Sequence, residues 1–267
     1  MKRLYPLIIG FTFSLMLSVI GCLADSLWLA VVGNIGSSSL GVFVTYIFDK
    51  LDTHGQGLRL WYQQIKYRNE EIRLSFSYLY KISVDGKYLL VKGNRLKNQY
   101  QPIGGVYKYY PEAKPHLEKF NYRPDIKMGN EKETDDLRLW IKGSHLLAYM
   151  DWFLSMKNRE YDPYREFKEE LLDTNLLPQD KFSVLKYRKV MVHDKGIQHS
   201  KFLDCYEYVY ADIFELTLTE EQQDLIRKAV SEHPDQLCLA TAEELRKECY
   251  KSIEKNLGTN CEWLIGG

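Results

Sequence analysis

Two long uncharged stretches near the N-terminus place the strongest constraint on how this chain can fold. Residues 4–23 contain no charged side chain, and neither do residues 27–48, so each stretch is long enough to cross a bilayer as an α-helix. Only residues 24–26 connect them, which predicts an antiparallel transmembrane hairpin over residues 1–50. A cleaved signal peptide is the alternative for the first stretch, but that stretch is long for a signal peptide and a second one follows directly.

Basic residues flank this hairpin on both outer sides. Lys2 and Arg3 precede it, further basic residues follow from Lys50 onward, and the short connection holds only Asp25. The positive-inside rule therefore predicts a two-pass cell-membrane protein with both termini and the soluble domain in the cytoplasm. The five cysteines have neither CxxC nor Cys/His spacing, which fits reduced thiols there and predicts no zinc site or disulfide framework.

Small residues recur at four-residue spacing in the second stretch. Gly33, Ser37 and Gly41 fall near one another on one side of the predicted helix, with Asn34 beside them. Small residues let helices approach closely in lipid, and an asparagine amide there needs a hydrogen-bond partner. Two interpretations stay open, namely packing within one hairpin and self-association between chains into an oligomer.

The remainder of the chain has the composition of a folded domain. The 36 basic and 36 acidic residues of the whole sequence give a formal net charge of zero, which argues against binding to a DNA or RNA polymer. Residues 51–68 are polar with an amphipathic patch and predict a juxtamembrane connector. Residues 69–267 combine alternating apolar segments with capped helical segments and no fixed repeat, which predicts an α+β or α/β sandwich.

Hydrophobic periodicity and capping patterns locate the individual elements of that domain. Strands are predicted over residues 74–84, 88–91, 137–141, 182–192 and 202–216, with a turn at Asp85 and Gly86. Helices are predicted over residues 146–153, capped by Ser144, over residues 164–172, and after capping boxes at Thr219 and Thr241, the last with an apolar stripe of Leu245, Cys249 and Ile253. Residues 110–136 are predicted to form a long loop or insertion.

The densest group of carboxylates lies on the predicted helix over residues 164–172. Glu166, Glu169 and Glu170 are three or four residues apart and can share one helix face. Carboxylate oxygens suit Mg²⁺, so these three are candidate metal ligands, and candidate catalytic residues if the domain is an enzyme. A solvated acidic helix, with Arg165 as an ion-pair partner, is the other interpretation.

The acidic helix also carries a recognisable motif. Arg165 to Glu170 reads Arg-Glu-Phe-Lys-Glu-Glu, which resembles the Arg-Glu-x-x-Glu-Glu core of the Nudix box, and Gly104–Gly105 resembles the glycine pair that begins the box. The two parts are 60 positions apart here, far more than in the usual box. Glu112 is the nearest candidate for its intermediate glutamate, and Leu172 stands where a glycine usually follows the glutamates.

Two predicted spans followed by a split Nudix-like box resemble the two-transmembrane NUDIX-like effectors that are associated with CD-NTases in CBASS anti-phage systems. The segments 136–138, 158–160 and 210–216 contribute to this resemblance. It implies that a CD-NTase makes a cyclic oligonucleotide on infection and that the cytosolic domain senses it. The membrane part would then self-assemble, act on membrane lipid and arrest or kill the cell.

The alternative function that the resemblance implies is a membrane-anchored Nudix-type nucleotide hydrolase. In Nudix hydrolases the glutamates of the box hold divalent metal ions, which activate water against a nucleoside diphosphate linkage. The sequence offers Glu166, Glu169 and Glu170 for that role, with Mg²⁺ as the cofactor. The split box and the long insertion weaken this interpretation, because metal catalysis needs closely held ligand geometry.

A cluster of basic and aromatic residues around the glycine pair suits the sensor role. A cyclic di- or trinucleotide presents several phosphates and base faces, so its site needs positive charge and stacking rings. The candidate ligand-binding residues are Arg95, Lys97, Gly104, Gly105, Lys108 and Arg165, with tyrosines at positions 100, 107, 109 and 110 close to them in sequence. A basic surface loop with tyrosines at its edge is the other interpretation.

Overall fold

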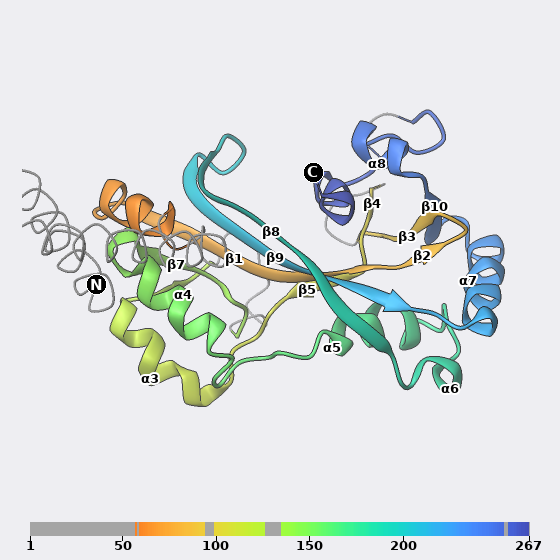
Figure 1. Ribbon diagram of the computed structural model, residues 1–267, viewed down its shortest axis with the longest axis horizontal. Helices are drawn as coiled ribbons and strands as arrows, with labels where there is room; N and C mark the ends of the chain where they lie inside the picture. The colour runs from red at the N-terminus through yellow and green to blue at the C-terminus, as the bar shows by residue number, and fades with distance from the viewer. Residues whose placement is uncertain (1–56, 58, 94–98, 126–134, 254–255, 267) are drawn as a thin grey trace, which may run out of the picture. The chain divides into compact units, whose positions relative to one another are not determined.

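The structure is a computed structural model that describes residue 57 and residues 59–93, 99–125, 135–253 and 256–266. The chain divides into two compact units, residues 1–62 and 63–267, and the strands and helices named below all belong to the second (Figure 1). The predicted transmembrane hairpin, with Gly33, Asn34, Ser37 and Gly41, lies outside the described residues. Among the helices that the structure describes, none combines the length and the apolar character needed to span a bilayer.

A mixed β-sheet organises the second unit. Its strand order is β6-β7-β1-β9-β8, and β5 also pairs with β1. The central β1 (Glu71–Lys81) runs antiparallel to β7 (Arg138–Lys142) and parallel to β9 (Cys205–Thr217). The edges are formed by β6 (Arg123–Pro124) and by the long β8 (Lys186–Ser200), while β5 (Gly104–Val106) pairs with the later part of β1.

A second, smaller sheet continues from the end of β1. It contains β2 (Ser83–Val84), β3 (Lys87–Lys92), β4 (Tyr100–Gln101) and β10 (Leu237–Ala240). The predicted turn at Asp85 and Gly86 is confirmed, since both residues have positive φ, 53° and 73°, and they connect β2 to β3. A turn of this kind matches the twist of two antiparallel strands.

Helices cover both ends of the sheets (Figure 1). Near one end lie α3 (Lys114–Leu117) and α4 (Leu146–Leu154), and near the other lie α6 (Gln179–Phe182), α7 (Glu220–Glu232) and α8 (Ala242–Lys247). Between them α5 (Tyr164–Phe167) continues into a π-helical turn (Lys168–Leu172). Short 3₁₀ turns complete the fold at Pro111–Ala113, Glu118–Phe120, Gly143–His145 and Thr259–Ile265.

The core joins the acidic helix to the sheets. Phe167 and Leu171, on the side of the helix away from its carboxylates, pack in one hydrophobic cluster with Tyr80 of β1 and Ile226 of α7, and all four are fully buried. Burying side chains of this size contributes roughly 1.5–3 kcal/mol each. The helix that carries the Nudix-like motif is therefore anchored by its own apolar face, as its sequence pattern predicts.

Most predicted elements are found, and the predicted mixed α/β domain is confirmed. Both capping boxes form, at Thr219 with Gln222 and at Thr241 with Glu244. The predicted loop over residues 110–136 contains α3, β6 and two 3₁₀ turns within its described part.

Several boundaries are wrong, each for a local reason. Ser144 caps no helix, because it lies within the 3₁₀ turn Gly143–His145. Gly143 in this turn packs closely on Tyr67, so that a Cβ there would lie 2.1 Å from the Tyr67 carbonyl oxygen. Buried Phe182 ends α6, so β8 starts only at Lys186.

At the C-terminal side, two further boundaries differ from the prediction. Phe202 lies in the turn before β9, which starts at Cys205. Glu248 has a left-handed φ of 50° and ends α8, which leaves Cys249 and Ile253 beyond the helix that they were predicted to line.

Candidate functional site

The two halves of the split motif meet in space. Gly104 and Gly105 lie on β5, and the helix with Arg165 and Glu166 packs directly over them. A Cβ built on Gly105 would lie 2.0 Å from Glu166 Oε1, so a larger residue there would displace the Glu166 carboxylate from its present position. Gly104 has a φ of 148°, and its Cβ would lie 2.2 Å from the Tyr78 carbonyl oxygen of β1.

The helix begins and winds in a way that separates its three glutamates. Pro163 precedes the first turn, and the Asp162 carboxylate accepts a hydrogen bond from the Tyr164 N–H at 2.9 Å. From Lys168 the backbone is π-helical, which changes the angle between successive side chains. Glu166 and Glu170 consequently face the glycine pair, whereas the Glu169 side chain is 53% exposed.

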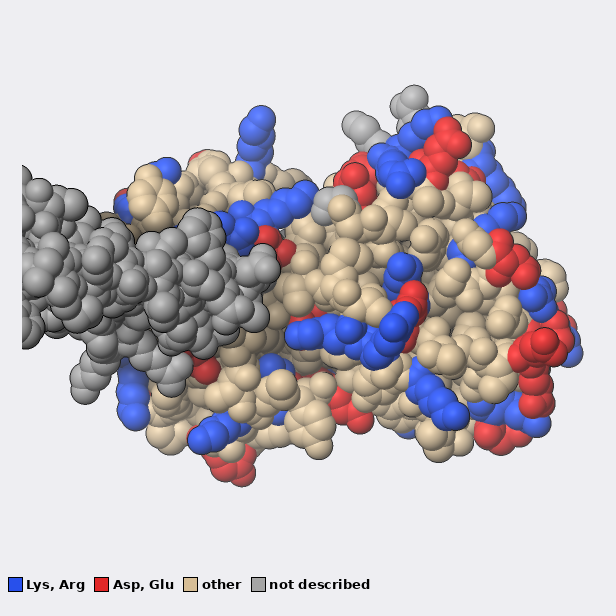
Figure 2. All heavy atoms as spheres, viewed as in Figure 1, with Lys and Arg blue, Asp and Glu red and all other residues tan. Residues whose placement is uncertain are grey.

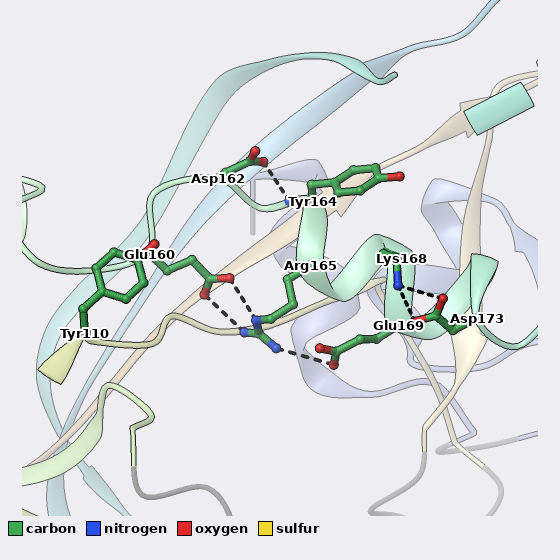
Figure 3. Close-up of a pocket in the computed structure, with 8 residues that line it drawn as sticks. All are labelled: Tyr110, Glu160, Asp162, Tyr164, Arg165, Lys168, Glu169 and Asp173. Carbon is green, nitrogen blue, oxygen red and sulfur yellow. Dashed lines mark hydrogen bonds and ion pairs between the residues drawn. The ribbon is translucent and has the colours of Figure 1, made fainter. Parts of the chain in front are cut away.

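Arg165 occupies the centre of the carboxylate cluster (Figure 3). Its Nε and Nη2 donate to the two oxygens of Glu160 at 2.9 and 3.2 Å, and Nη2 also donates to the Val106 carbonyl oxygen of β5 at 2.9 Å. Its Nη1 contacts Glu166 Oε1 and lies 3.5 Å from Glu169 Oε2. Burial works to lower the pKa of Arg165, but the hydrogen bond to Glu160 and the charge of Glu166 raise it overall.

Glu160 pairs with Arg165, although it is not among the site residues predicted from the sequence. Its side chain is buried, and its Oε2 also accepts the Lys108 N–H at 3.1 Å. Glu112, the nearest sequence candidate for the intermediate glutamate, is exposed on the 3₁₀ turn Pro111–Ala113. The sequence shows only that Glu160 is an acidic residue five positions before Arg165. The structure shows that its carboxylate contacts the Arg165 guanidinium.

A cavity of about 410 Å³ opens beside this cluster (Figure 3). Its volume lies in the range of small-molecule sites. It is lined by Tyr110, Glu160, Asp162, Tyr164, Arg165, Lys168, Glu169 and Asp173. Both of its cations are engaged by carboxylates, since Lys168 Nζ donates to both oxygens of Asp173 at 2.9 Å.

Comparison with known protein families decides how this assembly is classified. A family model described as the SMODS-associated NUDIX domain matches residues 71–265. The chain belongs to the SMODS-associated NUDIX domain family. No curated protein matches the chain.

The family match confirms the Nudix likeness that the split motif predicts. It also supports an effector role in a CBASS-type antiviral system. The matched range contains β1, β5 and the acidic helix, so every part of the glycine–arginine–glutamate assembly belongs to the SMODS-associated NUDIX domain.

The glutamates of this SMODS-associated NUDIX domain lie in contact with other protein groups. Within the described residues, no three or more His, Cys, Asp or Glu side chains are arranged to hold a metal ion. Arg165 contacts Glu166 and Glu169, and the Gly104 N–H donates to Glu170 Oε2 at 3.1 Å. In this structure the glutamates predicted to hold Mg²⁺ thus contact Arg165 and the Gly104 N–H.

The candidate ligand-binding residues are only partly brought together. Gly104, Gly105 and Arg165 form the assembly described above, and Lys108 joins it through its backbone N–H. Arg95 and Lys97 lie outside the described residues.

The tyrosines near the glycine pair have different positions. Tyr107 and Tyr109 are buried, with the Tyr107 hydroxyl donating to Asp212 at 2.7 Å, so neither offers a free stacking face. Tyr110 is 44% exposed and lines the cavity.

Buried carboxyl groups give this domain a testable pH dependence. Burial raises the pKa of Glu170 from 4.5 to about 8, opposed by the Gly104 N–H, and burial likewise raises the pKa of Glu166. The folded state therefore keeps a proton on Glu170 that the unfolded chain releases above pH 4.5. The stabilisation from that proton is complete below pH 4.5 and is lost as the pH rises toward 8.

We expect Glu170→Gln to remove this dependence, because an amide still accepts the Gly104 N–H but does not ionise. The gain in stability of the variant over the wild type should grow between pH 5 and pH 8 by up to ~1.4 kcal/mol per pH unit. Urea unfolding of both proteins at several pH values measures it. If the free energies of unfolding of the variant and the wild type changed equally with pH, the raised pKa of Glu170 would be contradicted.

Proposed function

We propose that this chain is a CBASS effector whose SMODS-associated NUDIX domain senses a cyclic oligonucleotide made by a CD-NTase. The observation that carries the proposal is the pairing of Arg165 with Glu160, Glu166 and Glu169. This pairing favours a binding role over metal-dependent hydrolysis, because the carboxylates that a hydrolase would use are already engaged.

The cavity beside Arg165 supplies groups that suit such a ligand. A ligand phosphate can compete with the exposed Glu169 for Arg165, since these two side chains are joined only by a 3.5 Å contact. A second phosphate can compete with Asp173 for Lys168 at the exposed edge of the helix. The partly exposed ring of Tyr110 offers a face for a base.

In the proposed function, residues 1–50 are the part of the chain that acts on the membrane after the ligand binds. In this proposal they form a two-helix hairpin in the cell membrane, with both termini and the NUDIX domain in the cytoplasm. Ligand binding drives assembly if the ligand binds the assembled state more tightly than the free chain. Close helix packing through Gly33, Ser37 and Gly41, with Asn34 as a polar partner, then disrupts the membrane and arrests the infected cell.

The test uses the full-length protein in lipid nanodiscs with a panel of cyclic di- and trinucleotides, with and without Mg²⁺. We expect one nucleotide to raise the unfolding temperature and to remain intact by chromatography. At a ligand concentration one hundred times Kd, linkage gives about 2.7 kcal/mol of stabilisation. Tyr110→Ala should reduce the shift, whereas Tyr161→Ala, which is 66% exposed and does not line the cavity, should leave it unchanged.

Two outcomes would overturn the sensor proposal. Consumption of a nucleotide in the presence of Mg²⁺ would favour the second candidate, a membrane-anchored Nudix-type hydrolase that uses Glu166, Glu169 and Glu170. The spatial assembly of the split box is the observation that favours this candidate. Absence of stabilisation by every nucleotide would also overturn ligand sensing.

A further inference from the structure

The β8–β9 hairpin ends in an exposed aromatic side chain. Residues 201–204 form its turn, and Phe202 in that turn is 84% exposed. Lys201 beside it is also exposed. A fully hydrated phenylalanine at a loop tip leaves apolar area in water that burial against another surface would recover.

The hairpin holds this tip in a defined position. Cross-strand pairing continues to the last pair before the turn, Ser200 with Cys205. The His199 ring packs on Tyr206 at a centroid distance of 5.3 Å, and the Ser200 hydroxyl accepts the Leu203 N–H at 3.4 Å. Phe202 is therefore presented at the end of a paired ribbon.

The tip lies at the end of the domain where the chain arrives from residues 1–62. Gln63 Oε1 accepts the Ile197 N–H of β8 at 3.1 Å, and the Tyr67 ring packs on Tyr206 of β9 at a centroid distance of 4.8 Å. Figure 1 shows the turn of the hairpin toward the same end as the orange segment before β1. Since a strand rises about 3.3 Å per residue, Phe202 lies up to ~16 Å beyond the Gln63 contact.

Other exposed side chains at this end have the character of membrane-surface contacts. Ile65 is 51% exposed, and the exposed Lys66 places its Nζ over the Tyr67 ring at 4.9 Å. On the face visible in Figure 2, basic and acidic residues are interspersed, and the turn also holds Asp204, whose side chain is 95% exposed. Apolar and aromatic groups flanked by lysine are the residues that anchor proteins at a lipid headgroup layer.

We infer that the β8–β9 tip contacts the surface of the bilayer that holds the N-terminal hairpin. The inference rests on the membrane part of the proposed function. Fourteen residues separate the end of the second uncharged stretch at residue 48 from Gln63. Such a segment reaches at most about 50 Å even when fully extended, which keeps this end of the domain near the membrane. Phe202 enters the headgroup layer, and Lys201 contacts anionic lipid.

The experiment measures the depth of the tip directly. Full-length Phe202→Trp is reconstituted in nanodiscs that contain brominated lipid, which quenches nearby tryptophan, and the emission of the wild type is subtracted. Val184→Trp is the matched control, because Val184 is 77% exposed but precedes β8 at the far end of the hairpin. Both positions are exposed, so neither change should disturb folding.

We expect brominated lipid to quench the emission of the tryptophan added by Phe202→Trp. The emission of the tryptophan added by Val184→Trp should stay unchanged. In the Phe202→Trp background, Lys201→Glu should weaken quenching in anionic lipid more than in zwitterionic lipid. If the added tryptophan of Phe202→Trp is not quenched while the chain resists alkaline extraction, the tip contact is overturned and the anchor stands. Burial of the tip against a second copy of the chain would give that result. A chain that fails to remain with the lipid would overturn the membrane anchor and the tip contact together.

Discussion

Replacing Gly104 with alanine should lower the free energy of unfolding by about 3–5 kcal/mol. Two causes act together at this position. The backbone φ of 148° is one that L side chains rarely adopt, and the new Cβ would lie 2.2 Å from the Tyr78 carbonyl oxygen and 2.9 Å from Leu79 Cα. Because both of these atoms belong to the central strand, relief requires β5 to move away from β1, which would also pull the Gly104 N–H from Glu170.

Gly86→Ala is the control that measures the cost of a positive φ without a steric clash. Gly86 also has positive φ, 73°, but no atom lies within 4 Å of its Cβ position. A left-handed alanine costs about 1–2 kcal/mol. Chemical unfolding of the two variants beside the wild type measures the difference, and an equal loss for both would contradict the tight contact of β5 with β1.

Arg165→Gln should be nearly as damaging, with a loss of about 3 kcal/mol at pH 7. Its removal leaves the buried Glu160 and the partly buried Glu166 carboxylates without their cation, and the Val106 carbonyl oxygen loses a donor. Protonation relieves the repulsion between carboxylates, so the loss should shrink as the pH falls toward 4. Unfolding curves at pH 7 and pH 4 provide the measurement.

Arg188→Gln is the control for that change. Arg188 also pairs with a glutamate, Glu215 at 2.7 Å, but its side chain is 74% exposed. Ion pairs in water contribute little to stability, so this variant should resemble the wild type at both pH values. If Arg165→Gln were equally mild, Arg165 would not be the residue that holds the carboxylate cluster together.

The parts of the fold that the sequence predicts well are those where local chemistry determines the outcome. Alternation in β1, the Asp85–Gly86 turn and the capping boxes at Thr219 and Thr241 each depend on neighbours within a few positions, and each is found. The start of β8 and the end of α8 depend instead on tertiary packing and on a left-handed residue, Glu248.

The candidate site shows the same division. The residue types of the box and its split are readable from sequence, and Gly105 and Glu166 do meet. The role of Glu160 and the outward position of Glu169 follow from a chain reversal and a π-helical turn, which no residue periodicity indicates. Burial of Tyr107 and Tyr109 follows from their inward positions, which sequence proximity to lysines does not determine.

The parallel pairing of β1 with β9 determines when this protein can complete its fold during synthesis. Ile72 of β1 pairs with Tyr206 of β9, so 134 further residues must be synthesised after Ile72 before this pairing can form. At 5–20 residues per second, that delay is roughly 7–27 s. The uncharged N-terminal stretches leave the ribosome well before then, so their synthesis is complete before the NUDIX domain can finish folding.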